Sequence, residues 1–280
     1  MKLALAQINT KLGKPKQNLE KHLNLIEQAK SQSVDLVVFP ELSLTGYILQ
    51  DLAQSVACRP SHEDPVFGPL LDASQNIDIV VGFVEEDQRS RYFISAAYLS
   101  QGEVLHIHRK VYLPTYGLFD ESRFFAAGDE VRAFDTRFGR FGILICEDFW
   151  HVSPPYLLWL DGADLMVFIS ASPSRGLSSS PQPESSHWVE HINQAYASLF
   201  TIFVASTNRV GYEDGINFWG GATLYNPSGN LVIRGPYQEE ALTVTDIDLS
   251  DLHHFRARSP LLRDERPELT LKELKRILRR

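Results

Sequence analysis

The sequence has few cysteines, no long apolar run and fewer basic than acidic side chains. Its two cysteines, Cys58 and Cys146, are too few for a disulfide framework in a chain of 280 residues. Without a second pair of cysteine ligands, the sequence also excludes a cysteine-rich zinc site. No apolar stretch approaches the roughly 20 residues that cross a bilayer, and Asn9 and Lys11 interrupt the opening run before a signal-peptide core can form. We therefore expect a cytoplasmic protein with free thiols and no membrane association.

The charge balance is acidic, but basic side chains gather at the carboxyl end. The chain has 35 acidic and 27 basic residues and a formal net charge of −8. This balance argues against a nucleic-acid binder, because phosphate backbones are held mainly by accumulated Lys and Arg. Residues 256–280 contain nine basic and four acidic side chains and carry +5, whereas residues 1–255 carry −13. A basic segment on an acidic body favours docking on that body or on a sister subunit.

Hydrophobic periodicity predicts alternating strands and helices. Apolar runs at 3–8 and 34–39 flank a helical pattern that begins at Pro15, which indicates a strand–helix–strand opening with buried strands. Further apolar runs predict strands at 77–84, 94–99, 104–107, 141–145, 165–170, 201–206, 221–225, 231–234 and 242–248. This alternation is typical of an α/β protein.

The later part of the chain contains one segment of different composition. Serine and proline dominate residues 172–186, which predicts a long surface loop, and a helix follows at 189–199. No linker of low complexity divides the body. The sequence thus predicts a single α/β domain over residues 1–255 and a basic helical tail over residues 256–280.

Two charged side chains stand directly after predicted strands, where the edge of a sheet can present them to a cleft. Pro40 ends the strand at 34–39, because it lacks a backbone N–H, and leaves Glu41 at the strand exit. A carboxylate there either caps the next helix or serves as a base. Lys110 lies between apolar neighbours, so it is either a surface lysine with a buried stem or a cation positioned in a site.

Cys146 follows the strand at 141–145 and precedes a turn, a position that nucleophiles occupy on other α/β sheets. A thiol needs a neighbouring base or cation in order to react at neutral pH. Histidine is the usual base, but spacing alone places none of the candidates beside the thiol. These candidates are His108, His151, His187 and His191. Cys58 has no such setting, and we expect it to be an inert buried thiol.

The order and spacing of Glu41, Lys110 and Cys146 resemble those of the nitrilase, or carbon–nitrogen hydrolase, superfamily over almost the whole chain. The resemblance implies that Glu41 is a general base, that Lys110 helps to hold the oxyanion and that Cys146 forms a thioester with the acyl group. It also implies a four-layer αββα sandwich and a homodimer or a larger homo-oligomer. Neither a metal ion nor an organic cofactor is implied.

Two segments, 113–121 and 145–150, are similar to the glutamine-hydrolysing domain of glutamine-dependent NAD synthetases. This likeness implies that Glu121 is a second glutamate, which orients Lys110. It also implies a pocket in which Glu147 contacts the amino end of the substrate and Arg175 is a candidate contact for a carboxylate. The expected pocket residues are Tyr47, Tyr116, Phe119, Glu147 and Ser172.

We therefore predict an enzyme that hydrolyses a non-peptide C–N bond, with a small linear carboxamide such as glutamine as its substrate. The same site would suit a nitrile or an N-carbamoyl compound, since a thiolate attacks those carbons equally well. No glycine- and serine-rich pyrophosphate loop follows Leu249. We therefore expect either a free-standing amidase or a subunit that supplies ammonia to a separate synthetase chain.

Overall fold

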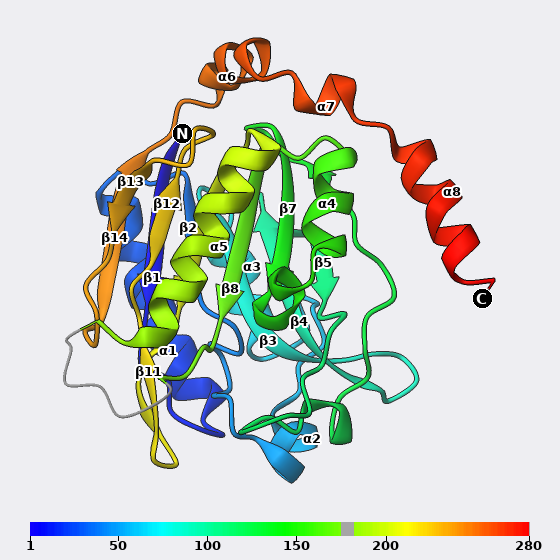
Figure 1. Cartoon of the computed structure of the whole chain (residues 1–280). Coiled ribbons are helices and arrows are strands. Elements are labelled where there is room, and N and C mark those ends of the chain that lie inside the picture. The colour runs from blue at the N-terminus through cyan, green and yellow to red at the C-terminus, as the bar shows by residue number, and fades with distance from the viewer. Residues whose placement is uncertain (175–181, 280) are drawn as a thin grey trace.

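The computed structural model describes residues 1–174 and 182–279, in which two six-stranded sheets lie between layers of helices (Figure 1). The first sheet has the order β14-β1-β2-β3-β4-β5, and β1, β2 and β3 are parallel. Its strands in that order are Ala241–Asp246, Lys2–Gln7, Leu36–Val38, Asp78–Glu86, Tyr92–Ser100 and Glu103–Arg109.

The second sheet has the order β13-β12-β9-β8-β7-β6, and β7, β8 and β9 are parallel. Its strands in that order are Leu231–Arg234, Thr223–Tyr225, Phe203–Asn208, Leu165–Ser170, Arg140–Ile145 and Phe134–Asp135. A separate hairpin joins β10 (Val210–Glu213) to β11 (Ile216–Trp219).

Helices form the two outer layers. The first sheet packs against α1 (Pro15–Ser31) and α3 (Phe67–Ala73), and the second packs against α4 (Ser153–Leu160) and α5 (Glu184–Phe200). The short helical elements are α2 (Ala53–Val56), η1 (Gln50–Leu52), η2 (Glu121–Arg123), η3 (Cys146–Trp150) and η4 (Leu249–Asp251).

The core explains why the strands are apolar on both faces. Leu3 and Leu5 of β1 point into the space between the sheets, whereas Ala4 and Ala6 face the helices of the outer layer. Side chains alternate across a strand, so a sheet that is covered on both faces needs apolar residues at every position. This packing, with helices outside and two sheets inside, confirms the predicted four-layer αββα sandwich.

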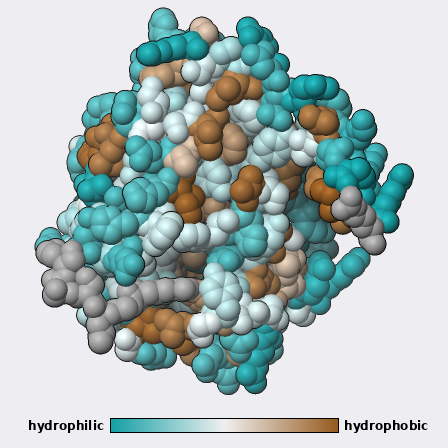
Figure 2. Space-filling view, viewed as in Figure 1, coloured by the Kyte–Doolittle hydropathy of each residue, from teal (hydrophilic) through white to brown (hydrophobic). Residues whose placement is uncertain are grey.

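The tail follows η4 as three helices, α6 (Leu252–Arg258), α7 (Leu261–Asp264) and α8 (Pro267–Ile277), and Figure 1 shows α8 at the edge of the molecule beyond α4. Tyr156 of α4 holds the segment just before α8, because the Tyr156 hydroxyl donates to Glu265 Oε1 at 2.9 Å. Figure 2 shows hydrophobic side chains among hydrophilic ones on the face that carries α4 and α5.

The structure corrects the long surface loop predicted for 172–186. Ser172 and Pro173 are buried, and helix α5 already begins at Glu184; residues 175–181 lie outside the described residues. Ser186 is fully buried, and its hydroxyl donates to the Pro183 carbonyl at 2.8 Å. A helix therefore begins within this serine-rich segment, and this local hydrogen bond stabilises its first turn.

The periodicity also leaves several short elements unpredicted, among them β6, β10 and β11, whose few residues give too short a pattern. Within residues 1–174 and 182–279, no helix has the length and apolar character that crossing a membrane requires.

Candidate active site

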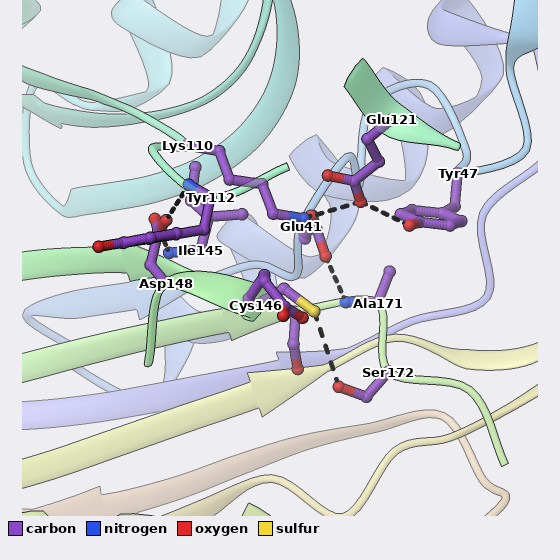
Figure 3. A network of polar contacts seen from close by, with 12 residues as sticks. Glu41, Tyr47, Lys110, Tyr112, Glu121, Ile145, Cys146, Asp148, Ala171 and Ser172 are labelled. Carbon is purple, nitrogen blue, oxygen red and sulfur yellow. Dashed lines mark hydrogen bonds and ion pairs between the residues drawn. The ribbon is translucent and has the colours of Figure 1, made fainter. Parts of the chain in front are cut away.

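Three strand ends converge to bring Glu41, Lys110 and Cys146 into one buried cluster (Figure 3). Glu41 follows β2, Lys110 follows β5 and Cys146 follows β7. Their exposed fractions are 1%, 0% and 7%. A charged lysine is almost never buried unless it is paired. The structure therefore excludes the alternative of a surface Lys110 with a buried stem.

Two carboxylates hold the Lys110 ammonium. Its Nζ donates to Glu41 Oε1 and to Glu121 Oε1, both at 2.8 Å. Although burial alone would lower the pKa of Lys110, the charges of Glu121 and Glu41 raise it well above its ordinary value. Lys110 is therefore a fixed cation in this site rather than a base.

Glu41 is held from the second sheet as well. Its Oε2 accepts the backbone N–H of Ala171, at the end of β8, at 2.8 Å. The backbone of Glu41 also packs closely on the first sheet, since a Cβ on Gly82 of β3 would lie 2.8 Å from the Glu41 Cα. The carboxylate of Glu41 thus bridges Lys110 and the strand next to that of Cys146, rather than capping a helix.

Cys146 occupies a strained backbone position at the turn from β7 into η3. Its φ is 46°, which is uncommon for a residue other than glycine and recurs at functional turns. Burial and the neighbouring Glu41 charge raise the pKa of the Cys146 thiol well above its ordinary value, although the Lys110 charge opposes them. The thiol is thus neutral in the free protein and needs a base to remove its proton.

Two of the predicted histidine alternatives, His108 and His151, have other partners. Nε2 of buried His108 lies 2.8 Å from Asp148 Oδ2, and His151 is stacked on Tyr112. The charges that act on the Cys146 thiol are instead carboxylates and an ammonium. The geometry therefore favours a carboxylate as the base.

Glu121, in η2, is the second carboxylate that accepts the Lys110 ammonium. Its Oε1 also accepts the Tyr47 hydroxyl at 2.5 Å, whereas its buried Oε2 has no hydrogen-bond partner. Burial raises the pKa of Glu121 to about 7, even though Lys110 opposes the shift. Tyr47 is held in turn by Glu213, which accepts the Tyr47 N–H at 2.8 Å. The sequence gives no signal for Glu213, since it lies 166 residues from Tyr47.

A cavity of about 470 Å³ opens beside the thiol. Its wall includes four of the five predicted pocket residues, namely Tyr116, Phe119, Glu147 and Ser172. The remaining lining residues are Cys146, Trp150, Pro173, Glu184, Ser185, Trp188 and Val189. The cavity is of the size of small-molecule sites, and aromatic rings make up much of its wall.

Tyr47 and Arg175, which were also predicted for the pocket, are not among the described residues that line this cavity. The ring of Tyr47 meets that of Phe119 edge to face, and Tyr47 lines a neighbouring hollow together with Glu121. Arg175 lies outside the described residues.

Polar groups of the cavity wall approach the thiol or bond to one another. Ser172 Oγ lies 3.9 Å from Cys146 Sγ, and the Tyr116 hydroxyl donates to both oxygens of Glu147 at 3.0 Å. Trp188, on the first turns of α5, was not predicted from sequence, because the serine-rich segment separates it from the recognisable motifs. Its exposed fraction of 61% is a weak signal that it serves a ligand rather than the core.

Comparison with known proteins agrees with this site and fold. The family model for carbon–nitrogen hydrolases matches residues 2–257, so the chain belongs to the carbon–nitrogen hydrolase family, the nitrilase superfamily. It is an enzyme that cleaves non-peptide C–N bonds.

More specific likenesses are to larger and to similar-sized proteins. The chain is 31% identical over 259 residues to a glutamine-dependent NAD(+) synthetase of Thermotoga maritima, covering 90% of this chain but 42% of that protein. It thus spans less than half the length of such relatives. A carbon–nitrogen hydrolase from Helicobacter pylori G27 has the same fold, with a TM-score of 0.83, 23% identity and 99% of both chains covered. So does a variant of an amidase from Nesterenkonia sp. AN1 in complex with acrylamide, with a TM-score of 0.81, 23% identity, and 97% of this chain and 96% of that chain covered.

Proposed function

We propose that the protein hydrolyses a small linear carboxamide to a carboxylate and ammonia through a thioester on Cys146. The observation that carries this proposal is the buried Glu41–Lys110–Glu121 cluster, whose three charges all act on the Cys146 thiol. A neutral thiol beside a carboxylate and a fixed ammonium has the base and the electrophilic partner that acyl transfer needs.

The first half-reaction forms the thioester. Glu41 removes the thiol proton, and the sulfur of Cys146 attacks the amide carbon, so that a C–S bond forms and the carbonyl oxygen becomes an oxyanion. The Lys110 ammonium and the backbone N–H of Glu147 donate to that oxygen. Glu41 then returns its proton to the amide nitrogen, the C–N bond breaks, and ammonia leaves.

The second half-reaction releases the acid. Glu41 removes a proton from water, and the oxygen of that water attacks the thioester carbon. The C–S bond breaks, the carboxylic acid leaves, and the sulfur regains a proton from Glu41. Glu121 stays in place throughout and keeps Lys110 directed at the oxyanion, as its 2.8 Å bond to Nζ requires.

The cavity wall supports a substrate with an amino group at the end remote from the amide. The Glu147 carboxylate lies on this wall within reach of the Tyr116 hydroxyl, and Glu184 contributes a second acidic side chain. Glutamine fits this description, and the Thermotoga relative is glutamine-dependent by name. The aromatic wall would enclose the methylene groups between the two ends.

A direct test replaces the nucleophile. Cys146→Ala should abolish ammonia release from glutamine and other small amides, and mass spectrometry of the wild type should find the acyl group on the peptide that contains Cys146. Cys58→Ala is the matched control, since Cys58 is also buried and burial raises the pKa of its thiol. Wild-type turnover by the Cys146→Ala variant would refute the proposal.

A second candidate substrate is an N-carbamoyl compound with a terminal amine. It is favoured by the acidic wall, because the charged residues among the described lining positions are Glu147 and Glu184, and neither can bind the carboxylate of glutamine. Hydrolysis of a carbamoyl compound releases carbon dioxide as well as ammonia, and hydrolysis of an amide does not. Product analysis with glutamine, a linear ω-amino carboxamide and its N-carbamoyl amine counterpart separates the candidates.

We also propose that the tail docks on a sister subunit. Helix α8 leaves Leu271, Leu274 and Ile277 about half exposed along one face, at 53%, 51% and 53%. Exposed apolar side chains of the body, Leu157 of α4 and Leu199 of α5, offer a matching surface. The tail is basic and the body acidic, so opposite charges favour the same contact. A separate synthetase chain is the alternative partner.

A further inference from the structure

One fully buried carboxylate, that of Asp148 in η3, accepts bonds from two different strand ends (Figure 3). Its Oδ1 accepts the backbone N–H groups of Val111 and Tyr112, both at 2.9 Å. Its Oδ2 accepts the backbone N–H of Ile145 at 3.1 Å and lies 2.8 Å from His108 Nε2. An ionised carboxylate only accepts, so this histidine nitrogen carries the donated proton.

These partners are the chain neighbours of the reacting groups. Val111 and Tyr112 directly follow Lys110, and Ile145 directly precedes Cys146. The Asp148 carboxylate therefore joins the backbone that carries the ammonium to the backbone that carries the thiol. Multiple charge-assisted bonds to one carboxylate fix both backbones more firmly than a single neutral bond would.

This connection crosses the interior of the sandwich. Lys110 extends from β5 of the first sheet, and Cys146 extends from β7 of the second sheet. β5 and β7 belong to different sheets and pair with other strands, and side chains such as Tyr98 of β4 and Phe141 of β7 pack between the sheets. Apolar packing is non-directional, so it fixes the relative position of two strand ends less precisely than hydrogen bonds would.

We propose that Asp148 is a positioning residue, which sets the placement of the Lys110 ammonium relative to the Cys146 sulfur. The proposal rests on the roles given above to Lys110 and Cys146. Asp148 touches neither sulfur nor ammonium and is not a lining residue of the cavity. It acts through the backbone, and it also holds the turn in which Cys146 keeps its left-handed conformation.

His108 completes the arrangement from the first sheet. It is 3% exposed on β5, two residues before Lys110, and fills the remaining acceptor position of Asp148. If Asp148 accepted only backbone N–H groups, one lone pair of this buried carboxylate would have no hydrogen bond, which would cost folding free energy. His108 is thus the second positioning residue. It makes one of the four hydrogen bonds that Asp148 accepts.

The test is the isosteric variant Asp148→Asn. An amide retains one acceptor oxygen but places an NH₂ group against donors that it cannot accept from. We expect kcat for amide hydrolysis to fall about 10- to 100-fold, because displacements of about 1 Å in a site cost that much. KM should change less than about threefold, because the cavity wall is intact.

A second measurement separates positioning from general loosening. Alkylation of Cys146 by iodoacetamide forms a C–S bond and displaces iodide but builds no oxyanion, so it does not need Lys110 as an oxyanion donor. We expect its rate in Asp148→Asn to stay within about threefold of the wild type while kcat falls. Asp78→Asn is the matched control: Asp78 is 1% exposed and accepts the Tyr98 hydroxyl at 2.7 Å, at the opposite end of β3. It should lower the melting temperature without lowering kcat.

Two results would overturn the proposal. One is a wild-type kcat in Asp148→Asn with only a lower melting temperature, which is the signature of a purely structural carboxylate. The other is an equal loss of kcat and of alkylation rate. If Asp148→Asn does not fold, His108→Ala decides: a roughly 3- to 10-fold loss of kcat is expected, and an unchanged kcat refutes the role. Activity in Cys146→Ala would instead refute the nucleophile itself.

Discussion

Replacement of Lys110 by methionine, Lys110→Met, perturbs the electrostatic centre of the site. Methionine keeps an unbranched apolar side chain of similar length but removes the ammonium. In the wild type, that ammonium lies 2.8 Å from one oxygen of Glu41 and 2.8 Å from one oxygen of Glu121. Because Lys110 is fully buried, the substitution leaves two carboxylates near each other without their shared cation.

The kinetic consequence follows from the oxyanion. Loss of one donor to a developing oxyanion costs about 100- to 1000-fold in kcat, or roughly 3–4 kcal/mol. The loss should be at the upper end for Lys110→Met, since Glu41 and Glu121 would then share a proton and Glu41 would be a poorer base for the thiol. KM should change little, because Lys110 is not among the residues that line the cavity.

The stability consequence depends on pH. Removal of one partner from a buried ion pair costs about 3–5 kcal/mol when the other charge is left behind. The pKa of Glu121 is already raised to about 7, and Lys110 is the charge that holds it down. In Lys110→Met the pKa of Glu121 rises further, so the folded state retains a proton that the unfolded state releases. Stability is therefore lost as pH rises, and the deficit should be larger at pH 8 than at pH 6.

Urea unfolding at these two pH values and an ammonia-release assay measure both effects. Lys21→Met is the matched control, since Lys21 is paired with Glu240 at 2.6 Å but is 36% exposed. Surface pairs contribute about 0–1 kcal/mol, so the control should retain activity and most of its stability. A Lys110→Met enzyme within tenfold of wild-type kcat, or one with the same unfolding midpoint as the wild type at both pH values, would refute the roles assigned to this lysine.

Two other predictions concern Glu121 and the tail. Because the pKa of Glu121 is raised from 4.5 to about 7, its contribution to stability is present below pH 4.5 and is lost as pH rises through 7, a change of about 3 kcal/mol. Glu121→Gln should therefore flatten the urea-unfolding free energy between pH 5 and pH 8; an unaltered slope would contradict this account. Deletion of residues 266–280 should convert a dimer to a monomer in sedimentation experiments with little change in kcat, whereas equal masses for both forms would exclude the tail as the docking element.

The sequence carried enough information to predict the fold and the three central residues of the site. Lys110 and Cys146 directly follow a strand and Glu41 lies three residues beyond one, so local pattern places all three near strand ends. The family resemblance implied the αββα sandwich, which the structure confirms, whereas the apolar strands by themselves predicted only an α/β protein. The roles of these three side chains stay predictions until variants are measured.

The remaining residues of the site depend on contacts that no local pattern encodes. Asp148 acts through backbone N–H groups 36 and 37 residues away, and every residue but proline has such a group. The start of α5 was predicted as loop because Ser185 and Ser186 resemble a turn, yet Ser186 is buried. Trp188 reaches the cavity only because that helix begins early.

The architecture explains why the site needs more than three residues. The proposed base and cation follow strands of the first sheet, whereas the proposed nucleophile follows a strand of the second, so their mutual distances depend on the relative position of the two sheets. Two carboxylates bond across this gap: Glu41 accepts the Ala171 N–H at the end of β8, and Asp148 of η3 accepts the N–H groups that follow β5. The same packing that buries the core therefore sets the catalytic geometry. A mutation that removes one of these two bonds should lower kcat before it unfolds the chain.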